Sequence, residues 1–170
     1  MHGYCVAGGT DMALCSDLLV IEDQAKIGYP PARVWGSPTT AIWAYRIGLE
    51  KAKRLLFTGD SLSGTEAVAW GLATEAPGRA DLDARTDALV ERIGRVPVNQ
   101  LVMMKLLLNQ TVAAQGLAAV QTLGMVFDGI ARHTREGYAF ARRMAEAGPM
   151  PAVRERDAPF GDVGRSTFKG

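Results

Sequence analysis

Residues 3–17, GYCVAGGTDMALCSD, contain the pattern from which the fold class is predicted. Residues 4–7 have the composition of the end of a buried strand, Gly8-Gly9 interrupts that strand, and residues 10–15 have the composition of a short helix. This order brings free backbone N–H groups and the positive end of a helix dipole to one point. Such a turn can stabilise a negatively charged oxygen, although glycine pairs between strands and helices also serve as plain turns.

Apolar runs and turn residues divide the rest of the chain into a short α/β part and a longer helical part. Residues 18–22 (LLVIE) form a continuous apolar run of strand length, and residues 26–29 and 72–74 predict further short strands. Residues 30–38 contain three prolines and a glycine, which predicts a loop. Apolar spacing and capping residues then predict helices over residues 40–47, 50–57, 67–70, 82–93, 98–111, 117–131 and 134–147.

Two later segments stand out by composition. Residues 101–108 (LVMMKLLL) are apolar around nearly the whole circumference of the predicted helix. Such a helix is either deeply buried or faces another subunit. From residue 150 to residue 170 the composition shifts to Pro, Gly, Arg and Asp, which indicates a C-terminal tail.

The overall composition narrows the class of protein. A chain of 170 residues, 48% of them hydrophobic, has the length of about one domain and ample material for a core. Its net charge of +1 gives no reason to expect a nucleic acid or a membrane surface as partner. No apolar run approaches the roughly 20 residues that span a bilayer. The first residues show no basic region followed by an apolar core, so we expect no secretory signal. Cys5 and Cys15 form no metal-ligand pair, so we expect reduced thiols in a cytoplasmic protein and no metal site.

Several motifs resemble, in order, those of the enoyl-CoA hydratase/isomerase (crotonase) family. His2-Gly3, Ala7-Gly8-Gly9 and residues 14–18 (LCSDL) resemble the family signature in identity and spacing. The similarity extends over most of the chain, to about Arg143. It continues through QAKIGYP at residues 24–30, LFTGDSLS at 56–63, Glu66-Ala67 with WGLA at 70–73, and Arg135-Glu136-Gly137.

The resemblance implies an α/β, crotonase-like fold, a spiral of ββα units that is truncated in this chain, followed by a C-terminal helical trimerisation region. Residues 1–75 then correspond to the C-terminal part of the crotonase core, residues 76–148 to the helical oligomerisation region, and residues 149–170 to the tail. Family members carry a long part before this point, with the second oxyanion N–H donor and much of the coenzyme A pocket. Because the chain also starts in the middle of an apolar strand, we expect it to lack the N-terminal half of a longer protein.

Two catalytic residues are implied by the same resemblance. Gly8 stands where the family places one of its two oxyanion-hole N–H donors. Asp11 stands where hydratases of the family carry a catalytic glutamate, and Pro31 where they carry the second. Pro31 cannot exchange a proton, and the side chain of Asp11 is shorter than that of glutamate by one methylene group. The usual two-carboxylate mechanism of hydration is therefore not expected.

The resemblance also implies candidate residues for binding the acyl chain and coenzyme A. Residues 31–40 are shorter than the corresponding family loop, which partly walls the acyl pocket, so Tyr29, Pro31 and Trp35 are candidate substrate-binding residues. The alternative is that these side chains pack in the protein interior. Three arginines of the last predicted helix, Arg135, Arg142 and Arg143, are candidates for binding the phosphates of a coenzyme A held by a neighbouring subunit.

The expected function is therefore that of a family member acting on an acyl-CoA thioester through an oxyanion hole. Coenzyme A enters only as part of the substrate, and no other cofactor is expected. The alternatives are a non-catalytic acyl-CoA-binding protein or an inactive fragment of one. The resemblance also implies a homotrimer or a dimer of trimers.

Overall fold

A computed structural model describes residues 1–162 and 165–169 of the chain. Its sheet has the strands β1 (Tyr4–Val6), β2 (Lys26–Gly28) and β3 (Ser61–Ser63), in the order β1-β2-β3. β1 runs parallel to β2, and β3 runs antiparallel to it. Because each strand has only three residues, the sheet depends on the helices that pack against it.

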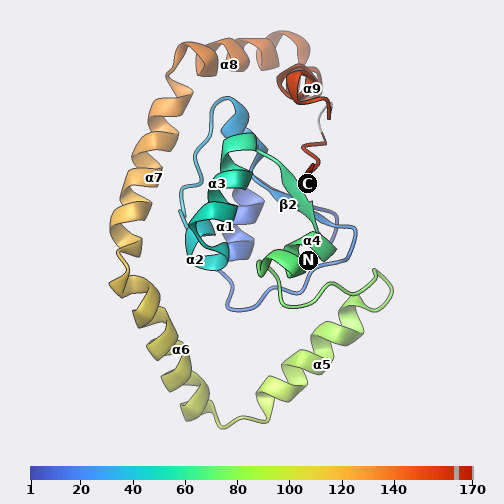
Figure 1. Ribbon diagram of the computed structural model, residues 1–170, viewed down its shortest axis with the longest axis vertical. Helices are drawn as coiled ribbons and strands as arrows, with labels where there is room; N and C mark the ends of the chain where they lie inside the picture. Colours follow the sequence, from blue (N-terminus) through green and yellow to red (C-terminus); the bar gives the residue numbers. More distant parts are fainter. Residues whose placement is uncertain (163–164, 170) are drawn as a thin grey trace.

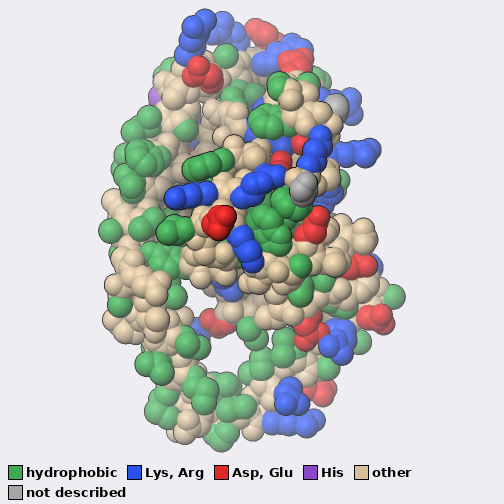
Figure 2. Space-filling view, in the orientation of Figure 1, with side chains coloured by type: hydrophobic (Ala, Val, Ile, Leu, Met, Phe, Trp, Pro, Cys, Tyr) green, Lys and Arg blue, Asp and Glu red, His purple; other side chains and the backbone are tan. Residues whose placement is uncertain are grey.

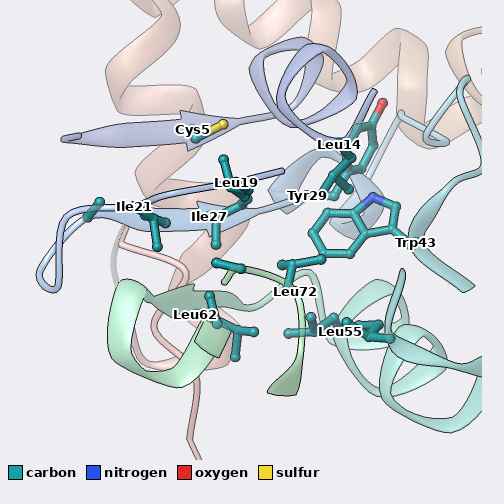
Figure 3. Close-up of a cluster of buried hydrophobic side chains, with 14 of the residues drawn as sticks. Cys5, Leu14, Leu19, Ile21, Ile27, Tyr29, Trp43, Leu55, Leu62 and Leu72 are labelled. Atoms are coloured by element: carbon teal, nitrogen blue, oxygen red, sulfur yellow. The ribbon is translucent and has the colours of Figure 1, made fainter. Parts of the chain in front are cut away.

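Short helices close the hydrophobic core around this sheet. They are α1 (Gly8–Leu14), the 3₁₀ helix η1 (Pro30–Arg33), α2 (Trp43–Ile47), α3 (Leu49–Thr58) and α4 (Gly64–Trp70). Figure 3 shows that the core side chains come from the strands, from the helices and from connecting segments, such as the one with Leu19 and Ile21, and gather between them. Its fully buried members include Leu14, Ile27, Trp43, Leu55 and Leu62.

Helix α4 (Gly64–Trp70) ends at the predicted residue but begins three residues before the predicted start at residue 67. The Ser63 side chain accepts a hydrogen bond from the N–H of Glu66 (3.2 Å), and the Glu66 side chain accepts one from the N–H of Ser63 (2.7 Å). This capping box satisfies donors that the helix itself leaves free. Gly71 ends the helix with φ 81°, a backbone angle that glycine adopts without strain. Gly64 is required by packing, because a Cβ atom there would lie 2.0 Å from the carbonyl oxygen of Glu22.

The strand predicted over residues 18–22 is only partly realised. This segment is in large part buried, as its apolar composition indicates, but it forms just an isolated parallel bridge between Val20 and Glu75. The N–H of Ile21 donates to the Glu75 carbonyl (3.0 Å), while the terminal ammonium of Met1 donates to the Val20 carbonyl (2.6 Å). Only single hydrogen bonds of this kind link the segment to its neighbours, so in the described residues it forms no regular ladder.

The helical part follows, with α5 (Leu82–Gly94), α6 (Val98–Ala114), α7 (Leu117–Arg132) and α8 (Arg135–Ala147). These four helices form an open arc around the core (Figure 1). α6 contributes no buried residue, and apolar side chains are exposed along α6 and α7 (Figure 2). In residues 1–162 and 165–169 no helix is both long and apolar enough to cross a membrane.

The segment predicted as a C-terminal tail contains regular structure and returns to the core. It includes α9 (Pro149–Asp157) and the 3₁₀ helix η2 (Ala158–Phe160). After residue 165 the chain lies beside β3, where the N–H of Ser61 donates to the Ser166 carbonyl and Ser61 forms a parallel bridge with Thr167. Composition did not indicate this return, because its partners lie about a hundred residues earlier in the chain. The proposed division at residues 75 and 148 stays a prediction.

Candidate active site at the start of helix α1

The junction of β1 and α1 leaves two backbone donors free. Ala7 has φ 54° and ψ −126°, a conformation that costs an L residue about 1–3 kcal/mol, and its carbonyl accepts from the N–H groups of Thr10 and Asp11. Among the described residues, the N–H groups of Gly8 and Gly9 make no hydrogen bond. A Cβ atom on Gly8 would meet nothing within 4 Å. Packing within the chain therefore does not require glycine here, whereas close approach of a ligand to the backbone would.

Hydrogen bonds to β2 and from α2 hold α1 at its two ends. The buried hydroxyl of Thr10 donates to the Gly28 carbonyl of β2 at 2.7 Å. At the other end, Arg46 of α2 donates to the carbonyl of Leu14 at 2.7 Å and to that of Ser16. A cation at this end also complements the negative end of the helix dipole. Sequence analysis did not identify Arg46, because its acceptors lie about thirty positions away.

Asp11 lies one helical turn after Gly8 and is half-buried. Its Oδ1 atom accepts a hydrogen bond of 2.7 Å from the hydroxyl of Thr40. The sequence did not single out Thr40, since nothing in the local pattern indicates a contact 29 residues away. A ligand that reaches the N–H of Gly8 thus approaches a carboxylate that can exchange protons with it.

Tyr29 lies within electrostatic reach of this carboxylate. Its side chain is buried, and its hydroxyl donates to the Ser37 carbonyl at 2.9 Å. Burial raises the pKa of Tyr29 to about 12, with further contributions from the charges of Asp11 and Asp128 and an opposing one from Arg132. The hydroxyl is therefore a neutral hydrogen-bond donor at physiological pH.

Trp35, the other predicted aromatic of the acyl pocket, lies against the helical part. Its ring makes an edge-to-face contact with Phe140 of α8, with 5.1 Å between centroids. The guanidinium of Arg132 in α7 lies 5.4 Å from the same ring. These contacts account for the tryptophan by packing, and they join the loop to α7 and α8.

Pro31 is in η1, whose position is fixed by the next-but-one residue, Arg33. The Arg33 side chain is fully buried and forms ion pairs with Asp60, Asp157 and Asp162 at 2.8–3.1 Å. Burial lowers its pKa, but the hydrogen bonds that Arg33 donates to the carboxylates of Asp162 and Asp157 outweigh this, and the pKa is raised overall. η1 is therefore tied both to the start of β3 and to the C-terminal segment.

The three candidate coenzyme A arginines lie on α8, apart from Asp11. Arg143 makes a two-bond ion pair with Glu155 of α9, at 2.8 and 2.6 Å. For Arg135 and Arg142 the described part of the structure shows no ion pair. The chain therefore places Tyr29 within reach of the charge of Asp11, which itself lies one turn after Gly8. Among the described residues no contact joins the α8 arginines to these three residues.

Two cavities in the described part of the chain are not lined by the start of α1, and no cluster of metal-ligating side chains is found there. Residues 1–162 and 165–169 hold no group of three or more His, Cys, Asp or Glu side chains that could bind a metal ion. Cavities of about 610 Å³ beside the C-terminal segment and about 450 Å³ beside α5 are lined by neither Gly8 nor Asp11.

Strands β1 and β2 pair in parallel, and a tight turn with free N–H groups leads from β1 into a helix that carries a carboxylate. Together with the helices that follow, these features are those of a crotonase-like α/β protein. Comparison with protein families agrees, since the model of the enoyl-CoA hydratase/isomerase family matches residues 1–145. The chain belongs to the enoyl-CoA hydratase/isomerase family.

Individual relatives support this assignment. The crystal structure of an enoyl-CoA hydratase from Mycobacterium smegmatis is 58% identical, with a TM-score of 0.93, over 98% of this chain and 57% of its own. Two curated proteins provisionally named enoyl-CoA hydratases also match. One, from Mycobacterium tuberculosis, is 30% identical over 70% of this chain and 38% of its own length. The other, from Thermus thermophilus, is 33% identical over 64% and 44%. The matching part of this chain thus covers less than half the length of each of these two relatives.

Proposed function

We propose that the protein acts on an acyl-CoA thioester, with the N–H of Gly8 as an oxyanion donor and Asp11 as the group that transfers a proton. One observation carries this proposal: a free, exposed backbone donor and a half-buried carboxylate lie one turn apart at the start of the same helix. Fixed N–H donors stabilise charge on a thioester oxygen without reorganising, which lowers the barrier to removing a proton from the neighbouring carbon.

A single carboxylate limits the reaction. Pro31 cannot hold a proton, so water addition by two cooperating carboxylates is not available in its usual form. A proton shift between two carbons of the acyl chain needs one group, because the proton that Asp11 removes is the proton that it returns. Isomerisation therefore fits these residues best, and thioester hydrolysis with an Asp11-activated water is the next reaction to test.

A second candidate function is binding of an acyl-CoA without chemistry. Pro31 favours this second function, because it removes one of the two proton-transfer positions while the N–H of Gly8 remains available to a thioester oxygen. In both cases coenzyme A is part of the ligand, and Tyr29, Pro31 and Trp35 are proposed to line the acyl site. Arg135, Arg142 and Arg143 are proposed to meet phosphates in a trimer or a dimer of trimers.

The experiment compares the 170-residue chain with two variants on 3-enoyl-, 2-enoyl- and saturated acyl-CoA substrates. Products are identified by mass spectrometry, and binding is measured by calorimetry. Asp11→Asn should reduce turnover by about 10²–10⁴-fold while leaving binding within a few-fold. Asp83→Asn is the matched control, because Asp83 also lies in the first turn of a helix but is exposed on α5.

Three outcomes separate the alternatives. Turnover that Asp11→Asn removes supports the enzyme. Binding without turnover on any of the thioesters supports the binding protein. If the chain neither binds nor turns over any thioester, both proposals are wrong for this chain.

A further inference from the structure

We infer that Thr40 is a positioning residue that fixes the carboxylate of Asp11, and that helix α7 holds Thr40 in place. This inference rests on the proposed role of Asp11 and extends it to the helical part of the chain. It joins three sets of contacts: between Thr40 and Asp11, within the turn that carries Thr40, and between that turn and α7.

The first contact acts on the carboxylate directly. The Thr40 hydroxyl donates to Oδ1 of Asp11 at 2.7 Å. A half-buried aspartate can rotate about two side-chain bonds, and this hydrogen bond selects one orientation. Oδ1 accepts from Thr40, whereas Oδ2 has no hydrogen-bond partner among the described residues, which makes Oδ2 the more available atom for proton exchange. Because aspartate reaches less far than glutamate, a fixed orientation matters more here.

The second set of contacts shapes the turn that carries Thr40. The N–H of Ala41 donates to the Pro38 carbonyl at 3.1 Å, which closes a tight turn over residues 38–41. Ala41 has φ 52°, in the left-handed region that residues with a Cβ atom rarely adopt. A turn in this conformation persists only where its surroundings hold it.

Helix α7 supplies those surroundings at two points about one turn apart. A Cβ atom on Gly124 would lie 3.1 Å from the Pro38 carbonyl oxygen and 3.3 Å from that of Thr39, so the helix backbone presses closely on the turn. The carboxylate of Asp128 accepts the N–H of Ser37 at 3.2 Å.

The Asp128 carboxylate is itself held by its own helix. Arg132 donates to its other oxygen through Nε at 3.0 Å. Both oxygens of Asp128 are therefore engaged, one by the loop and one by α7. As a result, the position of α7 sets the position of Thr40, and through Thr40 the orientation of Asp11.

The catalytic test uses the 170-residue chain with the thioester that it turns over best. Thr40→Val removes the hydroxyl but keeps the shape, and should lower kcat by about tenfold or more with KM within about twofold, because binding groups are unchanged. Thr40→Ser restores a hydroxyl and should recover kcat to within about threefold. Unchanged kcat in Thr40→Val, or no recovery in Thr40→Ser, would overturn the inference.

The test of α7 compares two glycines of the same helix. Gly124→Ala places a methyl group against the turn and should lower kcat in the same way as Thr40→Val. Gly129→Ala is the matched control, because a Cβ atom there meets nothing within 4 Å, and its kcat should not change. Equal effects of the two substitutions on kcat would contradict the role of α7.

A readout independent of turnover separates this inference from the proposed function. Thr40→Val should lower the thermal midpoint by about 2–5 °C in the parent chain, and by less than about 1 °C when Asp11 is already replaced by alanine, since the hydrogen bond is then absent. If the chain shows no turnover but Thr40→Val lowers the thermal midpoint only when Asp11 is present, the contact between Thr40 and Asp11 is supported although the proposed enzymatic function is wrong. Equal losses in both backgrounds would overturn the inference whether or not the chain is active.

Discussion

Nη1 of Arg33 lies 2.9 Å from Oδ1 of Asp157, and neither side chain is exposed to solvent. The same guanidinium contacts Asp60 and both oxygens of Asp162, and its Nε donates to the Thr58 carbonyl at 2.8 Å. One planar group with five donors thus joins η1, the start of β3 and the C-terminal segment. The candidate site and the end of the chain are therefore parts of one folded unit.

Substitution of Arg33 should strongly destabilise the protein. Arg33→Met leaves three carboxylates without their central cation, so we expect the free energy of unfolding to fall by about 3–5 kcal/mol. Arg33→Lys keeps the positive charge but not the five-donor geometry, so its free energy of unfolding should fall somewhat less than that of Arg33→Met. Urea unfolding followed by circular dichroism measures both. Arg79→Met is the control, because its contact with Asp83 is 4.0 Å long and exposed, and a loss of stability similar to that of Arg33→Met would contradict this account.

Stability should fall at acid pH through Asp157. Burial alone would raise the pKa of this carboxyl, but hydrogen bonds from Arg156 and Arg33 lower it below its ordinary 3.8. A carboxyl with a lowered folded-state pKa stabilises the fold above its unfolded-state pKa, and that contribution is lost as the pH falls through the folded-state value. We therefore expect the free energy of unfolding to decline below about pH 4. In Asp157→Asn the protein should be less stable at neutral pH and the decline shallower; an equally steep decline would assign it to other carboxyls.

At alkaline pH the corresponding group is Tyr29. Its pKa is raised to about 12 by burial and by the charges of Asp11 and Asp128. A raised folded-state pKa means that the stabilising contribution is complete below the ordinary pKa of 10 and is lost as the pH rises toward 12. Ultraviolet titration should show a tyrosine ionisation near pH 12 that is absent from Tyr29→Phe. Asp128→Asn should move that ionisation to lower pH, and an unmoved ionisation would show that Asp128 is not coupled to Tyr29.

The sequence predicted those features that depend on local patterns or family motifs. Apolar spacing located α5 to α8 within a few residues, and the serine–glutamate pair at the start of α4 forms the expected cap. The strand expected at residues 18–22 forms only an isolated bridge, because a buried apolar run does not specify how its backbone groups pair.

Long-range polar contacts were not predictable in the same way. Arg33 stands in a segment that reads only as a proline-rich loop, and its partners Asp157 and Asp162 lie far along the chain. Thr40 meets Asp11 only because the turn at residues 38–41 folds back under α7. Local propensity contains no information on such pairs, so the residues that orient the candidate site emerged only from the structure.

The exposed apolar surface of α6 leads to a prediction about assembly. Leu107 is 69% exposed, and α6 buries no residue within the chain. Exposed apolar surface on this scale is typical of an interface, and family resemblance implies a trimer or a dimer of trimers. Light scattering should therefore give a mass of three or six times 18.2 kDa. Leu107→Glu introduces charges into the interface and should shift the protein toward the single-chain mass. Asn109→Glu adds the same charge at a polar position of α6. Comparing the masses of the two variants tests whether the shift toward the single-chain mass depends on losing the apolar side chain of Leu107. A parent chain that is monodisperse at 18.2 kDa would contradict the prediction.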